Sequence, residues 1–334
     1  MTGASLYRVM QIIWAVDPFE STGNDEPSAL RDRAVDFLRA WGKRADVAIE
    51  AVYLLSPVEL NVSLDIEVPQ KTLMLEQYRQ SAELNLDKLI SDVAVPQIVD
   101  RQVLIEPSSS IRTSVERLSD YAKQKSADMI VVTSHGRKGF QRLLLGSFAE
   151  TLLLHSDVPV LVIGGHSSEH ALDLQRIVFA TDLGPHSKEL FEKTVFQAQQ
   201  LHSELFLFHA LPNPVEPVLQ SGMYLLGGGW VPMHQFFAED AEFRRTRLKE
   251  WAEWATSKGV RCEWALEETP GSISEAICHF AEVNKASLIS MAAQSGPVAT
   301  ALIGSIVRQV VRQSQVPVLI LRSLEGAEME EKSA

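Results

Sequence analysis

Residues 128–164 have the sequence DMIVVTSHGRKGFQRLLLGSFAETLLLHSDVPVLVIG. Residues 286–322, ASLISMAAQSGPVATALIGSIVRQVVRQSQVPVLILR, align with them without a gap. The offset is 158 throughout, and Leu144, Gly146, Ser147 and Ser156 recur together with the whole VPVL run. A period of this length is far too long for a solenoid and indicates a duplicated domain.

Each copy alternates apolar runs with amphipathic stretches. Strands separated by helices predict a parallel sheet covered on both faces. The expected fold class is α/β, with two tandem doubly wound, Rossmann-like domains that each contain a five-stranded, mostly parallel sheet. The expected strands are residues 7–17, 47–55, 97–105, 128–132 and 158–163, then 176–182, 204–210, 261–267, 286–291 and 316–321. The expected helices include 28–44, 72–93 and 111–125, then 187–201, 236–258 and 273–284.

The polar stretch after the first VPVL strand marks the boundary between the copies. We expect a first domain over residues 1–165, a linker over 166–173 and a second domain over 174–324. Residues 325–334 are acidic, which favours a disordered tail.

Composition restricts the classes of partner. The net charge of −12 argues against non-specific binding to nucleic acid or anionic membranes, which requires a basic surface. Two cysteines form neither a disulfide framework nor a metal-binding spacing, and the first residues lack the features of a signal peptide. No apolar run approaches the roughly 18 residues of a membrane span. A cytoplasmic protein without membrane insertion is the expectation.

The loop TSHGRKGFQRLLLGS, residues 133–147, joins an expected strand to an expected helix. Glycines allow close backbone approach to an anion, and the first N–H groups of a helix carry partial positive charge. The loop matches neither the Walker A nor the Rossmann pattern. Ser147 and Glu150 also form the S-x-x-E pattern of a capping box, which requires no ligand. The residues of the predicted phosphate cradle are Gly136, Gly139, Gly146 and Ser147, with the cations Arg137, Lys138 and Arg142.

These features resemble the universal stress protein family. Its nucleotide-binding members have G-x2-G-x9-G-[ST] at this place, matched here by Gly136, Gly146 and Ser147, with Thr133 replacing the first glycine. The family also has an aspartate that ends the first strand and contacts the nucleoside; Asp17 and Asp182 match it.

The resemblance implies a stress-response protein that binds ATP, with Mg²⁺ arriving on the nucleotide, and acts as a sensor or regulator. It implies that the two halves pair through their last strands as an internal pseudo-dimer, with a further homodimer left open. Slow hydrolysis at most is expected, because no dedicated base or Walker lysine is evident. The nucleotide-binding set implied by the resemblance also includes Leu54, His135 and Phe148.

The second half departs further from the family pattern. Met291 and Gln294 replace its early glycines, and the basic positions of the first loop become Ser295, Gly296 and Thr300. An uncharged, glycine-poor loop holds phosphate weakly. We therefore predict one competent nucleotide site in the first half. The degenerate second site would comprise Asp182, Gln294, Gly304 and Ser305.

Residues 212–230, PNPVEPVLQSGMYLLGGGW, are apolar yet rich in glycine and proline. They either pack against the partner domain or form a lid over a non-nucleotide, lipid-like ligand, lined by Met223, Tyr224 and Trp230. A nucleotidyl-transfer enzyme is a third hypothesis, which lacks signature motifs here. His135 and His209 are interpreted as structural, and no metal site is expected because no histidine pair has HxxxH spacing.

Overall fold

The computed structural model describes most of both repeats. The described residues are 8–19, 26–57, 68–134, 145–164, 169–211, 222–224, 230–269, 271–293 and 299–322. The predicted acidic tail lies outside these ranges. No helix among them combines the length and apolar character that a membrane span requires.

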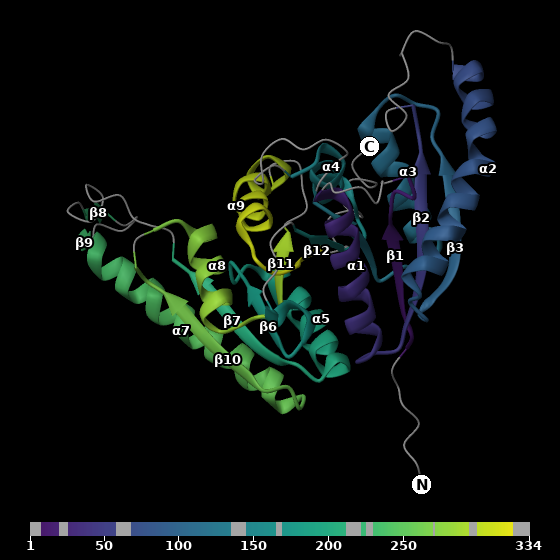
Figure 1. Cartoon of the computed structure of the whole chain (residues 1–334). Coiled ribbons are helices and arrows are strands. Elements are labelled where there is room, and N and C mark those ends of the chain that lie inside the picture. Colours follow the sequence, from purple (N-terminus) through teal and green to yellow (C-terminus); the bar gives the residue numbers. More distant parts are fainter. Residues whose placement is uncertain are drawn as a thin grey trace.

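In the described part of the first half, five strands alternate with four helices (Figure 1). Apolar runs form the strands because both faces of a parallel sheet are buried. The strands are β1 (Met10–Ala15), β2 (Val47–Leu55), β3 (Ile98–Ile105), β4 (Met129–Thr133) and β5 (Val160–Ile163). The helices are α1 (Glu26–Gly42), α2 (Val68–Val93), α3 (Ile111–Gln124) and α4 (Ser147–His155).

The second half follows after the short 3-10 helix η1 (Glu169–Leu172) and repeats the order. One addition interrupts it, a short antiparallel pair β8 (Gly222–Tyr224) and β9 (Trp230–Pro232) in the glycine- and proline-rich stretch. The main strands are β6 (Arg176–Ala180), β7 (Glu204–Ala210), β10 (Cys262–Glu267), β11 (Leu288–Ala293) and β12 (Val318–Arg322). The helices are α5 (Pro185–Leu201), α7 (Met233–Ser257), α8 (Ile273–Val283) and α9 (Ala299–Gln313).

All ten main strands belong to one sheet, in the order β10-β7-β6-β11-β12-β5-β4-β1-β2-β3. Within each half the neighbours are parallel, and between the halves β12 pairs antiparallel with β5. The expected pairing through the last strands is therefore present within the chain. Leu161 lies opposite Leu319, and these are equivalent positions of the two repeats, so a pseudo-twofold axis passes through this pair.

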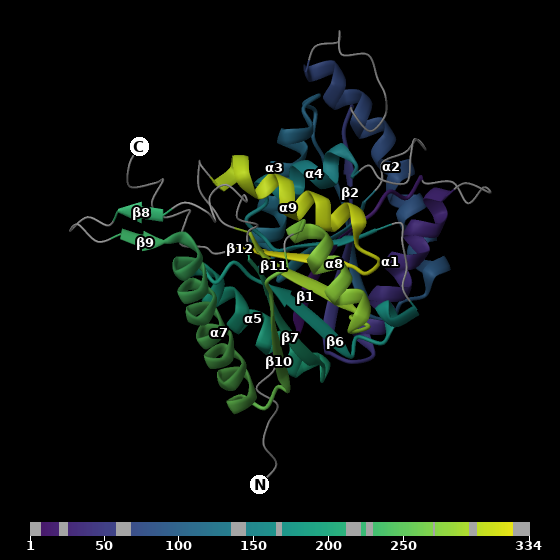
Figure 2. The ribbon, with the colours of Figure 1, turned by 90° about the vertical axis from the view of Figure 1, so that its left-hand side faces the viewer.

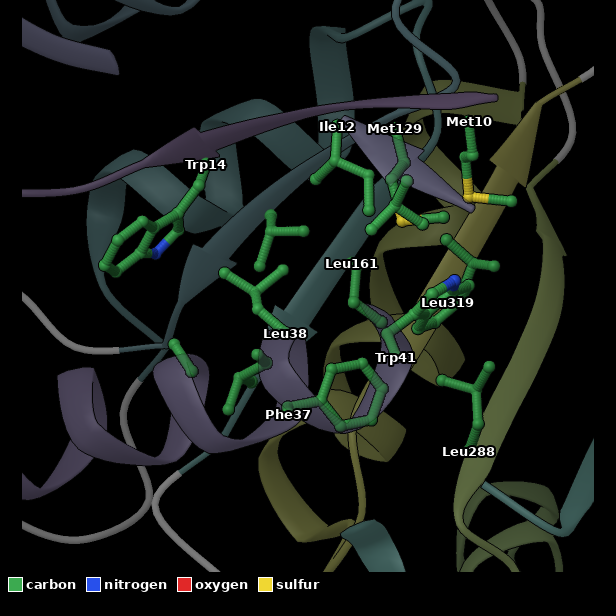
Figure 3. Close-up of a cluster of buried hydrophobic side chains, with 14 of the residues drawn as sticks. Met10, Ile12, Trp14, Phe37, Leu38, Trp41, Met129, Leu161, Leu288 and Leu319 are labelled. Atoms are coloured by element: carbon green, nitrogen blue, oxygen red, sulfur yellow. The ribbon is translucent and has the colours of Figure 1, made fainter. Parts of the chain in front are cut away.

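Helices cover both faces of the sheet across both halves (Figure 2). One apolar layer lies beneath α1, α2, α5 and α7, and the other lies beneath α3, α4, α8 and α9. Trp41 of α1 is buried in the first layer with Leu161 and Leu319 from the two sides of the seam, the β5–β12 pairing (Figure 3). The core is thus continuous from one half to the other.

Leu161→Ala tests this continuity. Leu161 is fully buried on the seam, so the cavity should lower the free energy of unfolding by about 3 kcal/mol in urea titrations. Leu172→Ala, at a half-exposed site just beyond β5, is the matched control and should cost far less. Equal effects of the two substitutions would show that the seam is not part of the core.

Candidate functional site

The strand order places a switch point in each half. Within the first half, chain connections leave β1 toward β2 on one side, whereas β4 lies on the other side. The equivalent point of the second half lies between β6 and β11. In open α/β sheets, ligands bind at the carboxyl ends of the strands at such a point.

Asp17 follows β1 at the first switch point and is partly exposed. Its Oδ1 accepts a hydrogen bond from the Phe19 backbone N–H at 2.9 Å, which orders the turn after the strand. The Phe19 ring packs edge-on against Tyr53 of β2, with 5.7 Å between the ring centroids. The carboxylate is therefore held at the strand end rather than left on a loose loop.

The predicted phosphate loop begins and ends beside this aspartate. The Gly146 N–H donates to the Ser134 carbonyl at 2.6 Å, and the Ser134 N–H donates to the Ile163 carbonyl at 3.0 Å. β4 lies directly against β1, so the base of the loop lies at the same sheet edge as Asp17. Six predicted site residues lie outside the described residues: His135, Gly136, Arg137, Lys138, Gly139 and Arg142.

The start of α4 corrects the capping-box prediction. Gly146, with extended backbone angles, is the N-cap, no side chain caps the helix, and Ser147 is already helical and exposed. Glu150 instead points to the second half, where it accepts a hydrogen bond from Arg308 at 2.8 Å. Ser147 and Glu150 therefore do not form a capping box, and Glu150 contacts the second half. An uncapped helix start leaves its first N–H groups to solvent or a ligand.

The remaining described residues of the predicted first-half site are Thr133, Leu54 and Phe148. Thr133 is the last residue of β4 and pairs with Ile163, so its backbone belongs to the sheet and not to the loop. Leu54 is buried in the apolar layer that also contains Leu145, and Phe148 packs against that layer. Leu54 and Phe148 therefore contribute to the apolar layer on this face of the sheet, and their place in a nucleotide site stays a prediction.

The second switch point is built differently. Oδ1 of Asp182 accepts hydrogen bonds from the Gly184 N–H at 2.8 Å and the Ser187 hydroxyl at 2.5 Å. Helix α9 begins at Ala299, so Gly304 and Ser305 lie inside it and not at its start. The pair is equivalent to Gly146 and Ser147 in the repeat, but α9 begins earlier along the repeat than α4 does, so the degenerate second site stays a prediction. Gln294 lies outside the described residues.

A polar network that the sequence did not indicate lies beside Asp182. His209, near the end of β7, is buried, and its Nδ1 lies 2.7 Å from the Thr181 carbonyl, which makes Nδ1 the protonated nitrogen. Its Nε2 accepts from Arg244 of α7 at 2.8 Å, and Arg244 also pairs with Asp240 at 2.7 Å. Only the place of His209 at a strand end could have signalled this network.

Burial is the main cause that lowers the pKa of His209, and the charge of Arg244 lowers it further. The Thr181 carbonyl and the carboxylates of Asp182 and Asp240 raise this pKa, but by less. The imidazole is therefore neutral at pH 7. Within the described ranges, no group of three histidine, cysteine or carboxylate side chains could hold a metal ion. The side chains of the predicted lid residues Met223, Tyr224 and Trp230 lie outside the description, so the lid remains a prediction.

Comparison with known proteins gives one family. The model of the universal stress protein family matches residues 12–164 and again 174–322. Universal stress protein MJ0531 of Methanocaldococcus jannaschii is 43% identical over 44 residues, which are 13% of this chain and 26% of that protein. The chain thus spans about a quarter of the length of this curated relative.

Two solved structures resemble nearly the whole chain. A universal stress protein from Archaeoglobus fulgidus has a TM-score of 0.61 at 18% identity, with 93% of this chain and 96% of that chain covered. A putative universal stress protein from Pseudomonas aeruginosa has a TM-score of 0.58 at 15% identity, with coverages of 97% and 98%. At such identities the likeness concerns the fold.

The neutral state of His209 predicts a pH dependence. Because its folded-state pKa lies below the ordinary 6.5, the unfolded chain takes up the proton first. The contribution of His209 to stability is complete above pH 6.5 and is lost as the pH falls through the folded-state pKa. His209→Asn should flatten the acid limb of the urea-unfolding free energy measured from pH 7.5 to 5. Exposed His202→Asn is the control, and equal acid limbs in all three proteins would contradict the assignment.

Proposed function

Because the chain belongs to the universal stress protein family, we propose that its first half binds Mg-ATP at the carboxyl ends of β1 and β4. The proposal rests on the geometry at the base of the loop. The Gly146-to-Ser134 hydrogen bond closes the loop beside Asp17, and the helix that follows has no side-chain cap. An anion at this helix start would receive free backbone N–H groups and the favourable end of the helix dipole.

The residues divide into two roles. Asp17 would accept hydrogen bonds from the nucleoside, since its turn holds one carboxylate oxygen in place and leaves the group partly exposed. Gly146, Ser147 and the cationic side chains of Arg137, Lys138 and Arg142 would surround the phosphates. Mg²⁺ would arrive on the nucleotide and offset the phosphate charge that an acidic protein disfavours.

The chemistry supports a switch more than a catalyst. Phosphoryl transfer requires an aligned nucleophile and stabilised charge on the transferring group. Asp17, the one carboxylate that the described residues place at the first switch point, is engaged in its own turn. We therefore propose a sensor or regulator of the stress response that acts through ATP occupancy, with hydrolysis slow or absent.

A second function for the other half follows from its different construction. The continued helix α9 removes the phosphate-binding start, and the His209–Arg244 pair adds a polar group beside Asp182. This half would bind a non-nucleotide small ligand, or none. Titration with nucleotide separates the two halves directly.

The test is Gly146→Asp. An aspartate at this N-cap should cap α4 and preserve the fold, while its charge repels phosphate. Calorimetric titration of the ligand-free protein with Mg-ATP should give one site per chain, weakened at least tenfold in the variant. Gly304→Asp, at the equivalent position inside α9, is the matched control and should bind ATP like the wild type.

Two results would contradict the proposal. Two equivalents of ATP with similar affinity would mean that the second half is competent despite the continued helix. Unchanged binding in Gly146→Asp, with the melting temperature preserved, would place the nucleotide elsewhere.

A further inference from the structure

Helices α4 and α9 lie side by side across the seam, one from each half (Figure 1, Figure 2). Glu150 of α4 forms an ion pair with Arg308 of α9 at 2.8 Å. It forms a second ion pair with Arg312 at 3.6 Å. All three side chains are partly buried, with 24%, 36% and 35% exposed. The cluster thus has one anion from the first half and two cations from the second.

Glu150 and Arg308 are equivalent positions, because their separation of 158 equals the repeat offset. Equivalent positions that touch must lie beside the pseudo-twofold axis, as Leu161 and Leu319 do. In a pairing of two identical halves, each such position would meet its own copy. Two first halves would bring glutamate against glutamate, and two second halves would bring arginine against arginine.

A second contact across the seam has the same asymmetry. Arg322 of β12 is buried and donates a hydrogen bond to the Leu153 carbonyl in the last turn of α4. The equivalent position in the first half is Gly164, which lies near the equivalent carbonyl, that of Val311, but has no side chain to reach it. The second half therefore supplies the cations, and the first half supplies the acceptors.

We propose that this seam selects its partner by charge: the α4 face of the first half fits the α9 face of a second half and rejects a copy of itself. The occupant is the α9–β12 face with Arg308, Arg312 and Arg322. Like charges this close to an axis, partly removed from water, oppose pairing more strongly than exposed charges do. Duplication within one chain permits this selection, since two identical chains must present identical faces.

The test uses full-length chains with reversed charge. Glu150→Arg gathers three cations at the seam, and Arg308→Glu with Arg312→Glu gathers three anions. Each variant should melt at a temperature lower by roughly 5 °C or more. A single chain with all three reversals restores opposite charges and should recover most of the loss. Glu116→Arg on the exposed side of α3 is the control for a charge reversal away from the seam.

Partner choice is tested by mixing after joint unfolding and refolding. The Glu150→Arg chain and the Arg308→Glu/Arg312→Glu chain are each mismatched within themselves, but each half of one fits the opposite half of the other. The mixture should form a complex of twice the chain mass in light scattering, with a melting temperature above that of either variant alone. Wild type treated in the same way should give no such gain.

Each outcome of these two experiments either supports or contradicts selection by charge. Recovery in the triple reversal together with the mixed complex supports selection by charge. Variants that melt like wild type, or a triple reversal that recovers nothing, would show that the apolar β5–β12 pairing holds the seam unaided. Destabilised variants whose mixture stays uncomplexed would show that the charges stabilise the seam without choosing a partner, and would overturn the proposal.

Discussion

The antiparallel pairing of β5 with β12 is the interaction on which the rest of the structure depends. A five-stranded parallel sheet that ended at β5 would expose a row of unpaired backbone groups on an apolar strand, which is a template for aggregation. Pairing with β12 satisfies these groups and brings Leu161 against Leu319. It also merges the apolar layers of the two halves, with Trp41 buried over the junction.

Because this junction joins two halves of one chain, the two switch points can differ in structure. In the first, the chain leaves β4, closes a loop through the Gly146-to-Ser134 hydrogen bond, and starts α4 without a side-chain cap. In the second, α9 begins earlier along the repeat, and Asp182 is engaged by Gly184 and Ser187. The same strand order therefore supports an uncapped helix start at the proposed phosphate site in one copy, and an aspartate bonded within its own turn in the other.

Helix α4 connects the proposed nucleotide site with the seam. Its start lies at the loop base, and its first turn contains Glu150, which pairs with Arg308. α4 is nine residues long, so its start and its contact with the second half lie within one short element. Under the proposed function, phosphate at the helix start and the arginines of the second half would contact the same short helix.

The sequence by itself determined the duplication, the α/β class and nearly every strand and helix, because apolar periodicity and an unbroken repeat offset are local properties of the chain. It also placed Asp17 and Gly146 at strand and helix ends. Only the tertiary structure decided that Glu150 serves the seam and not a capping box, and that His209 meets Arg244. It also showed that Gly304 lies inside a helix. Each of these depends on a partner distant in sequence or on where a helix begins, and residue spacing contains no information on which competing contact has the lower free energy.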